Sequence, residues 1–120
     1  MSRIIFIDDD PTTLRTASFI ARKGGASEIS CASSGAEGLE MIRAGLHELV
    51  FIDAEMPVMD GFKVLEALHT PEGLGEMTVY IMSGTVTEEL TRRALGAGAK
   101  GVIKKPFAPA ELINIIKSHG

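Results

Sequence analysis

The fold of this chain is best read from Ile4-Ile5-Phe6-Ile7-Asp8-Asp9-Asp10-Pro11, where an apolar run leads directly into three acids and a proline. An unbroken run of β-branched and aromatic residues is typical of a strand that is covered on both faces, and so of a parallel sheet. Asp10 and Pro11 are typical of a helix start, with Asp as the N-cap and Pro in the first helical position. The stretch therefore predicts a buried strand, an acidic turn and a helix.

The same unit recurs along the chain. Strands are predicted at residues 4–7, 28–32, 49–52, 79–82 and 102–103, of which 28–32 has the weakest pattern. Helices are predicted at residues 11–23, 35–44, 62–68, 87–97 and from Pro109 onward. Because strands and helices alternate five times, we expect an α/β fold: a single doubly wound (βα)5 domain, with a five-stranded parallel sheet, helices on both faces and right-handed crossovers.

Length and charge limit what such a domain can be. The 120 residues fit one domain, spanning residues 1–120, with no room for a second core. The net charge is −4 and no basic run occurs, which argues against direct binding of nucleic acid. The sequence contains neither an apolar run of about 20 residues nor a signal-peptide pattern, so we expect a cytoplasmic protein without a membrane partner.

Polar residues follow four of the predicted strands. Asp8 and Asp9 follow the first, Asp53 the third, Ser83 the fourth and Lys105 the fifth. Sites in open parallel sheets form outside the carboxyl ends of the strands, so we expect these side chains to share one crevice. Clustered carboxylates repel one another unless a cation is present, and such oxygen ligands suit Mg²⁺. Because a carboxylate can attack phosphorus, the residues predict phosphoryl transfer to an aspartate, with a lysine and a hydroxyl on the phosphoryl oxygens.

Four motifs carry a family resemblance. They are Ile7-Asp8-Asp9-Asp10-Pro11, Ile52-Asp53-Ala54-Glu55-Met56-Pro57 with Met59-Asp60-Gly61, Met82-Ser83-Gly84 and Lys104-Lys105-Pro106-Phe107. In order and spacing, and over essentially the whole chain, they resemble the receiver domain of two-component response regulators. The resemblance implies a flavodoxin-like strand order 2-1-3-4-5 and a phosphorylation switch that is not an enzyme in the usual sense.

The resemblance also implies a ligand set for the metal. Asp9 matches the direct carboxylate ligand of Mg²⁺, for which Mn²⁺ is a possible substitute, and Asp8 matches its neighbour that usually acts through water. Asp53 and the backbone carbonyl of Glu55 would complete the protein's share of the coordination.

Three further roles follow from the same resemblance. Asp53 matches the phosphoacceptor, which takes its phosphoryl group from a phosphohistidine on a sensor kinase or phosphotransfer protein. Ser83 matches the hydroxyl that turns toward the phosphoryl group, and Lys105 matches the lysine that pairs with Asp53 at rest. The Lys105–Pro106 bond is expected to be cis. Phosphorylation would change partner binding at the surface formed by the predicted fourth helix, fifth strand and fifth helix, in a monomer or a phosphorylation-dependent dimer.

One position departs from the family pattern. Val102 occupies the place of a residue that is usually aromatic, so it has no ring to move between exposed and buried states. This leaves open an alternative, a receiver-like interaction module that works without phosphorylation. A third reading, a phosphatase of the haloacid-dehalogenase type, needs a D-x-D motif that Asp53-Ala54-Glu55 satisfies only by half.

Overall fold

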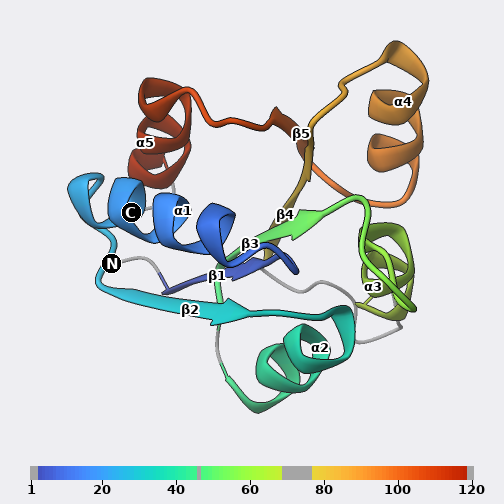
Figure 1. Cartoon of the computed structure of the whole chain (residues 1–120), viewed down its shortest axis with the longest axis horizontal. Coiled ribbons are helices and arrows are strands. Elements are labelled where there is room, and N and C mark those ends of the chain that lie inside the picture. The colour runs from blue at the N-terminus through green and yellow to red at the C-terminus, as the bar shows by residue number, and fades with distance from the viewer. Residues whose placement is uncertain (1–2, 46, 69–76, 119–120) are drawn as a thin grey trace.

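The computed structural model describes residues 3–45, 47–68 and 77–118, and shows a five-stranded parallel sheet in the order β2-β1-β3-β4-β5 (Figure 1). The strands are β1 (Arg3–Ile7), β2 (Glu28–Ala32), β3 (Leu49–Asp53), β4 (Thr78–Ser83) and β5 (Gly101–Lys104). The helices are α1 (Pro11–Lys23), α2 (Gly35–Ala44), α3 (Gly61–Leu68), α4 (Glu88–Gly96) and α5 (Pro109–Ser118). The predicted fold class and strand order are confirmed.

The helices begin where the sequence offers capping residues. The Asp10 side chain accepts a hydrogen bond from the backbone N–H of Thr12 at 3.0 Å, and Pro11 opens α1 as predicted. Ser34 caps α2 by accepting a bond of 3.1 Å from the N–H of Glu37. Thr87, which was expected inside the fourth helix, lies just outside it as the N-cap of α4. Side chains that bind backbone N–H groups thus fix the start of α1, α2 and α4.

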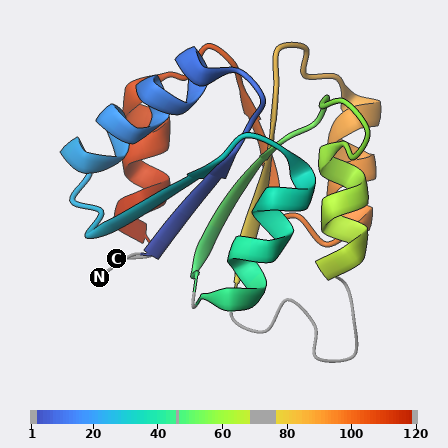
Figure 2. The ribbon, with the colours of Figure 1, turned by 60° about the horizontal axis from the view of Figure 1, so that its bottom comes forward.

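The sheet separates two apolar cores (Figure 2). On one face, α1 and α5 cover a core that contains stacked rings of Phe6, Phe51 and Tyr80, with centroids 4.9 Å and 5.6 Å apart along the row. On the other face, α2, α3 and α4 cover Ile7, Ile52 and their neighbours. The central strands are buried on both sides, which explains why their apolar runs are continuous rather than alternating.

The strand register aligns the carboxyl ends at one edge. Asp53 pairs with Met82 across β3 and β4, and Ser83 pairs with Lys104 across β4 and β5. Asp53 and Ser83, which were expected directly after their strands, are in fact the last residues of β3 and β4. Gly61 lets α3 begin against the end of β3, because a Cβ at this position would collide with the carbonyl oxygen of Asp53. The strand ends are therefore aligned at one edge, and α3 starts directly against the end of β3.

No helix within the described ranges combines the length and the apolar character needed to span a bilayer.

Candidate functional site

Three carboxylates meet at the carboxyl edge of the sheet. Asp8 and Asp9 follow β1, and Asp53 ends β3 in the neighbouring strand. One oxygen of each lies within 4.8 Å of the others. Asp8 is fully buried and Asp53 is 5% exposed, whereas Asp9 is exposed. This set of clustered hard oxygen donors, open to solvent through Asp9, fits a divalent cation such as Mg²⁺.

Lys105 places a positively charged side chain beside these carboxylates. Its Nζ lies 2.9 Å from Oδ2 of Asp8 and 3.1 Å from Oδ1 of Asp53. Its backbone N–H donates a 2.8 Å hydrogen bond to the carbonyl oxygen of Ser83, and the Lys105–Pro106 bond is cis, as expected. Burial lowers the pKa of Lys105, but the two carboxylates outweigh burial and raise it overall. Lys105 therefore remains charged and neutralises part of the acidic cluster.

Asp53 is left with incomplete compensation for its charge. Burial and the nearby Asp8 raise the pKa of Asp53 to about 6, although Lys105 and the backbone N–H of Glu55 act in the opposite direction. The Glu55 N–H lies 3.3 Å from Oδ1 of Asp53. An additional cation at this edge would favour the ionised form, which is the form able to act as a nucleophile.

Ser83 has its hydroxyl engaged within the loop that follows β4. The Oγ donates to the carbonyl oxygen of Thr85 at 2.8 Å and accepts from the backbone N–H of Thr85 at 3.2 Å. The residue is only 5% exposed. In this conformation the hydroxyl hydrogen-bonds within the loop. It would have to break its bond to the Thr85 carbonyl before it could donate to a group bound at Asp53.

The predicted site residues differ in how the structure places them, and Ser83 stands apart because its hydroxyl is bonded to Thr85. The structure brings together Asp8, Asp9, Asp53 and Lys105 through side-chain contacts. Glu55 joins through its backbone, while its side chain is exposed. The catalytic and metal-binding roles of all these residues, including the carbonyl of Glu55, stay predictions.

Sequence reasoning missed one feature beside the site. Val58 has a φ of 67°, which is unusual for a β-branched residue, and its side chain is 96% exposed. The backbone N–H of Met59 donates to the carbonyl of Pro57 at 2.7 Å, which closes a γ-turn around Val58. Pro57 and Gly61 do signal a turn here, but a valine gives no indication of a positive φ.

Val102 lies in β5, as predicted. It is partly buried and packs against the core on the α2–α4 face, to which Leu90 of α4 also contributes. A small β-branched residue therefore fills the position under α4.

Comparisons with known proteins identify the family. A family model described as the response regulator receiver domain matches residues 4–117. A probable chemotaxis protein CheY of Rhizobium etli is 30% identical over 105 residues, covering 88% of this chain and 81% of that protein. The transcriptional regulatory protein PrrA of Mycobacterium bovis is 30% identical over 116 residues, which span 97% of this chain and 48% of the regulator.

Solved structures show the same architecture. A CheY-like response regulator receiver domain protein from Methanospirillum hungatei superposes with a TM-score of 0.84 at 31% identity, covering 98% of this chain and 92% of that one. Vibrio cholerae chemotaxis protein CheY4 gives a TM-score of 0.90 at 22% identity, with coverage of 100% and 99%, and shows the shared fold.

Proposed function

This chain belongs to the response regulator receiver domain family, and from that premise we propose that Asp53 accepts a phosphoryl group from a phosphohistidine of a partner protein. The donor is a sensor histidine kinase or a histidine phosphotransfer protein, and phosphorylation changes the binding of a downstream protein. The observation that carries the proposal is the buried Asp53 carboxylate, which lies beside Asp8 and Asp9 with the Lys105 ammonium 3.1 Å away. A cation beside the acceptor and oxygen ligands for a metal are features that phosphoryl transfer uses, and they support the proposal.

A divalent cation is part of the proposal. Asp8, Asp9 and Asp53 would hold Mg²⁺, or Mn²⁺ in its place, together with the backbone carbonyl of Glu55. Two observations support the fit: the three carboxylates cluster within 4.8 Å, and Lys105 alone leaves the pKa of Asp53 raised to about 6. When bound, the cation supplies positive charge to the acceptor carboxylate and to the phosphoryl oxygens.

The chain's own residues then position the transfer. An oxygen of Asp53 forms a bond to phosphorus while the phosphorus–nitrogen bond breaks, and its electron pair returns to the ring nitrogen of the histidine. Because the other ring nitrogen of the phosphohistidine carries a proton, the donor leaves as neutral imidazole, and Asp53 becomes an acyl phosphate. Lys105 moves its ammonium from the Asp53 carboxylate to a phosphoryl oxygen. Attack by water later returns free Asp53 and inorganic phosphate.

Ser83 links this chemistry to the surface. To donate to a phosphoryl oxygen, its hydroxyl gives up the 2.8 Å hydrogen bond to the carbonyl of Thr85. The loop between β4 and α4 therefore changes conformation, and α4 begins at the end of this loop. The surface formed by α4, β5 and α5 is the one whose partner binding changes.

The remaining properties are part of the same proposal. We propose a cytoplasmic phosphoacceptor switch, which assists its own phosphorylation and dephosphorylation rather than turning over a substrate. It binds proteins rather than nucleic acid or membranes, and is a monomer or a phosphorylation-dependent dimer. The domain limits of residues 1–120 stay a prediction.

The proposal is tested by incubating the protein with acetyl phosphate and Mg²⁺ and recording the intact mass. We expect one phosphoryl group on the wild type and none on Asp53→Asn or in the presence of EDTA. A wild type that gains no adduct, while a known receiver is loaded in parallel, would refute phosphorylation at Asp53.

Val102 favours a second candidate function, that of a receiver-like interaction module that acts without phosphorylation. Its valine packs under α4 where the family usually has an aromatic ring. One measurement separates the two candidates once a downstream partner has been identified. If phosphorylation is the switch, acetyl phosphate changes the affinity of the wild type for this partner, and Asp53→Asn weakens this change. If the module acts without phosphorylation, the substitution has no such effect.

A further inference from the structure

A contact between two neighbouring helices joins the edge of the site to α4. The helices α3 and α4 lie side by side on one face of the sheet (Figure 2). The guanidinium carbon of Arg93, in α4, lies 3.9 Å from the centre of the Phe62 ring, in α3. This is well inside the range of about 6 Å in which a cation is attracted to an aromatic face. Within the described part of the chain Arg93 takes part in no salt bridge, so the ring is the partner that the structure gives to its charge.

Phe62 is held in place from the side of Asp53. It follows Gly61, which starts α3 directly against the carbonyl oxygen of Asp53 and donates its N–H to the carbonyl of Ala54 at 3.4 Å. The Phe62 side chain is 6% exposed and belongs to the core that α2, α3 and α4 cover. The position of this ring is therefore fixed relative to Asp53.

The helix α4 is attached to the core less firmly than α3. Of its nine residues only Ala94 is buried, whereas five of the eight residues of α3 are buried. Its N-cap, Thr87, follows the loop in which the Ser83 hydroxyl bonds to Thr85. When that bond breaks in the proposed switch, the start of α4 moves with the loop, and Arg93 moves relative to Phe62.

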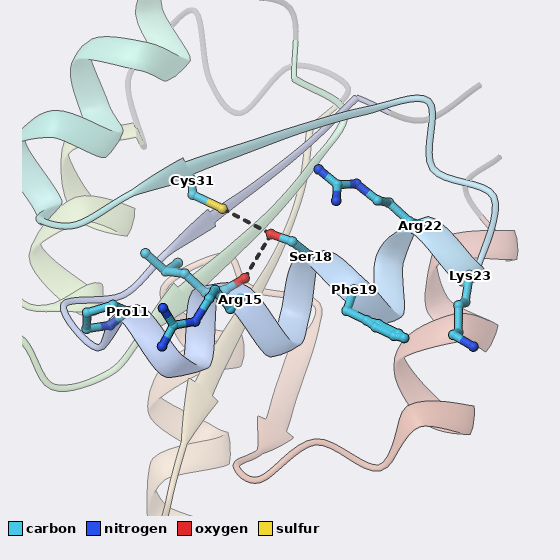
Figure 3. Close-up of a pocket in the computed structure, with 8 residues that line it drawn as sticks. Pro11, Arg15, Ser18, Phe19, Arg22, Lys23 and Cys31 are labelled. Atoms are coloured by element: carbon cyan, nitrogen blue, oxygen red, sulfur yellow. Dashed lines mark hydrogen bonds between the residues drawn. The ribbon is translucent and has the colours of Figure 1, made fainter.

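The structure leaves space for such a displacement. An open cavity of about 290 Å³ beside the contact is lined by Phe62, Glu66, Arg93, Gly96 and Ala97. A Cβ built at Gly96 meets no atom within 4 Å, so the end of α4 has room around it. The cavity of about 740 Å³ that α1 lines with Cys31, with Arg15 and Arg22 among its residues (Figure 3), involves neither α3 nor α4.

We propose that Arg93 is a positioning residue of the switch, and that its contact with Phe62 holds α4 in the unphosphorylated arrangement. This inference rests on the proposed function and names the contact that opposes the change. Because the contact joins a fixed helix to a less firmly held one, it is made in one arrangement and lost in the other, and such a contact shifts the equilibrium between them. Val102 offers α4 no ring, and the aromatic ring that α4 does contact comes from α3.

The first test measures the affinity for beryllium fluoride, a tetrahedral analogue of a phosphoryl group, in the presence of Mg²⁺. Amide chemical shifts of the ¹⁵N-labelled protein follow the titration. Arg93→Met keeps an extended side chain and removes its charge, so the unphosphorylated arrangement loses the contact. A cation–π contact at an exposed site changes an equilibrium constant about two- to fivefold, and we expect the variant to bind the analogue more tightly by about this factor.

Matched variants separate positioning from simple structural support. Arg92→Met removes the same charge from a neighbouring exposed residue of α4 that contacts no ring in the described ranges, and it should leave the affinity nearly unchanged. Arg93→Lys keeps a cation near the ring and should restore most of the wild-type affinity. In a Phe62→Leu background, Arg93→Met should have no further effect, because the contact is already absent.

A second test observes the contact directly. The side-chain protons of Arg93 that lie above the ring are shielded by its ring current, so they should resonate upfield of those of Arg92. Saturation with Mg²⁺ and beryllium fluoride should bring them to the positions found for Arg92. The same protons in Phe62→Leu give the reference without a ring.

The opposite results would overturn the proposal. Unchanged or weaker affinity in Arg93→Met, an equal gain in Arg92→Met, or an upfield shift that saturation leaves in place would each show that the contact does not hold the unphosphorylated arrangement. A loss of stability in Arg93→Met with wild-type affinity would make Arg93 a structural residue only. A wild type that neither binds beryllium fluoride nor gains mass from acetyl phosphate would instead refute the proposed function, and this inference with it.

Discussion

The ammonium of Lys105 lies 2.9 Å from Oδ2 of Asp8, so a lysine from the far end of the chain neutralises a carboxylate that is fully buried. The same ammonium contacts Asp53 at 3.1 Å. One cation thus serves two buried anions, and the site keeps excess negative charge in the absence of metal. The first three predictions follow from this imbalance.

Replacing Lys105 should destabilise the metal-free protein strongly. Lys105→Ala leaves Asp8 buried without its cation, which typically costs about 3 kcal/mol of unfolding free energy. We expect Mg²⁺ to restore part of this loss. Urea unfolding with and without Mg²⁺ measures both effects. The control is Lys104→Ala, because this exposed neighbour contacts neither acid; equal losses in the two variants would contradict the argument.

Asp53→Asn should stabilise the metal-free protein near neutral pH. The folded state keeps the proton of Asp53 up to about pH 6, whereas the unfolded chain releases it near 3.8. The folded state therefore binds more protons between these values, and the contribution of Asp53 to stability is full below pH 3.8 and is lost as pH rises through 6.

Asparagine has no such loss, so we expect the free energy of unfolding of the variant to exceed that of the wild type by about 3 kcal/mol above pH 7. The difference should disappear near pH 4. Urea unfolding in EDTA across this range gives the comparison. A stabilisation that does not vary with pH would point to packing rather than charge.

Replacing Asp9 should reduce the stabilisation of the protein by Mg²⁺ and should have little effect on the stability of the metal-free protein. Its side chain is exposed, so Asp9→Asn should change the stability of the metal-free protein by less than about 0.5 kcal/mol. Ligand binding stabilises the folded state by mass action, and the variant should lose this Mg²⁺-dependent rise in Tm. Thermal unfolding over a Mg²⁺ titration tests it, with Glu88→Gln on α4 as a control that keeps the full rise.

Val58→Gly should stabilise the protein although it removes a side chain. A positive φ costs a residue with a Cβ about 1–2 kcal/mol, and glycine avoids this cost. The greater conformational freedom of glycine in the unfolded chain offsets part of the gain. With φ at 67° and 96% exposure there is almost no packing to lose, so we expect a net gain of about 0.5–1 kcal/mol. Val86→Gly is the comparison, since its φ is not positive; it should be destabilising by a similar amount in the same urea experiment.

The sequence predicted the fold well because its signals are local and repeated. The unbroken runs around Phe6 and Phe51 mark strands with two covered faces, and Asp10-Pro11 marks a helix start. The clustering of Asp8, Asp53 and Lys105 could also be predicted, since parallel strands deliver their carboxyl ends to one edge.

Other features could not be predicted, because they depend on how separate elements pack and not on a local sequence pattern. The Ser83 hydroxyl hydrogen-bonds to Thr85 within one loop, and Val58 has a positive φ in the γ-turn that the Met59 N–H and the Pro57 carbonyl close. The cavity of about 740 Å³ that α1 lines together with Cys31 also depends on how these two elements pack. Helical spacing places Arg15 and Arg22 on one side, but it does not say whether a cavity lies beneath them.

The division of the interior into two cores has an evolutionary consequence. Successive side chains of β4 alternate between the cores, with Ile81 on the α2–α4 face and Met82 on the α1–α5 face. A substitution in α1 therefore disturbs packing on one side of the sheet, while the packing beneath α4 keeps its own neighbours. The two faces can therefore accumulate substitutions separately, so that the sequence of α1 can diverge between duplicated copies while the packing beneath α4 is retained.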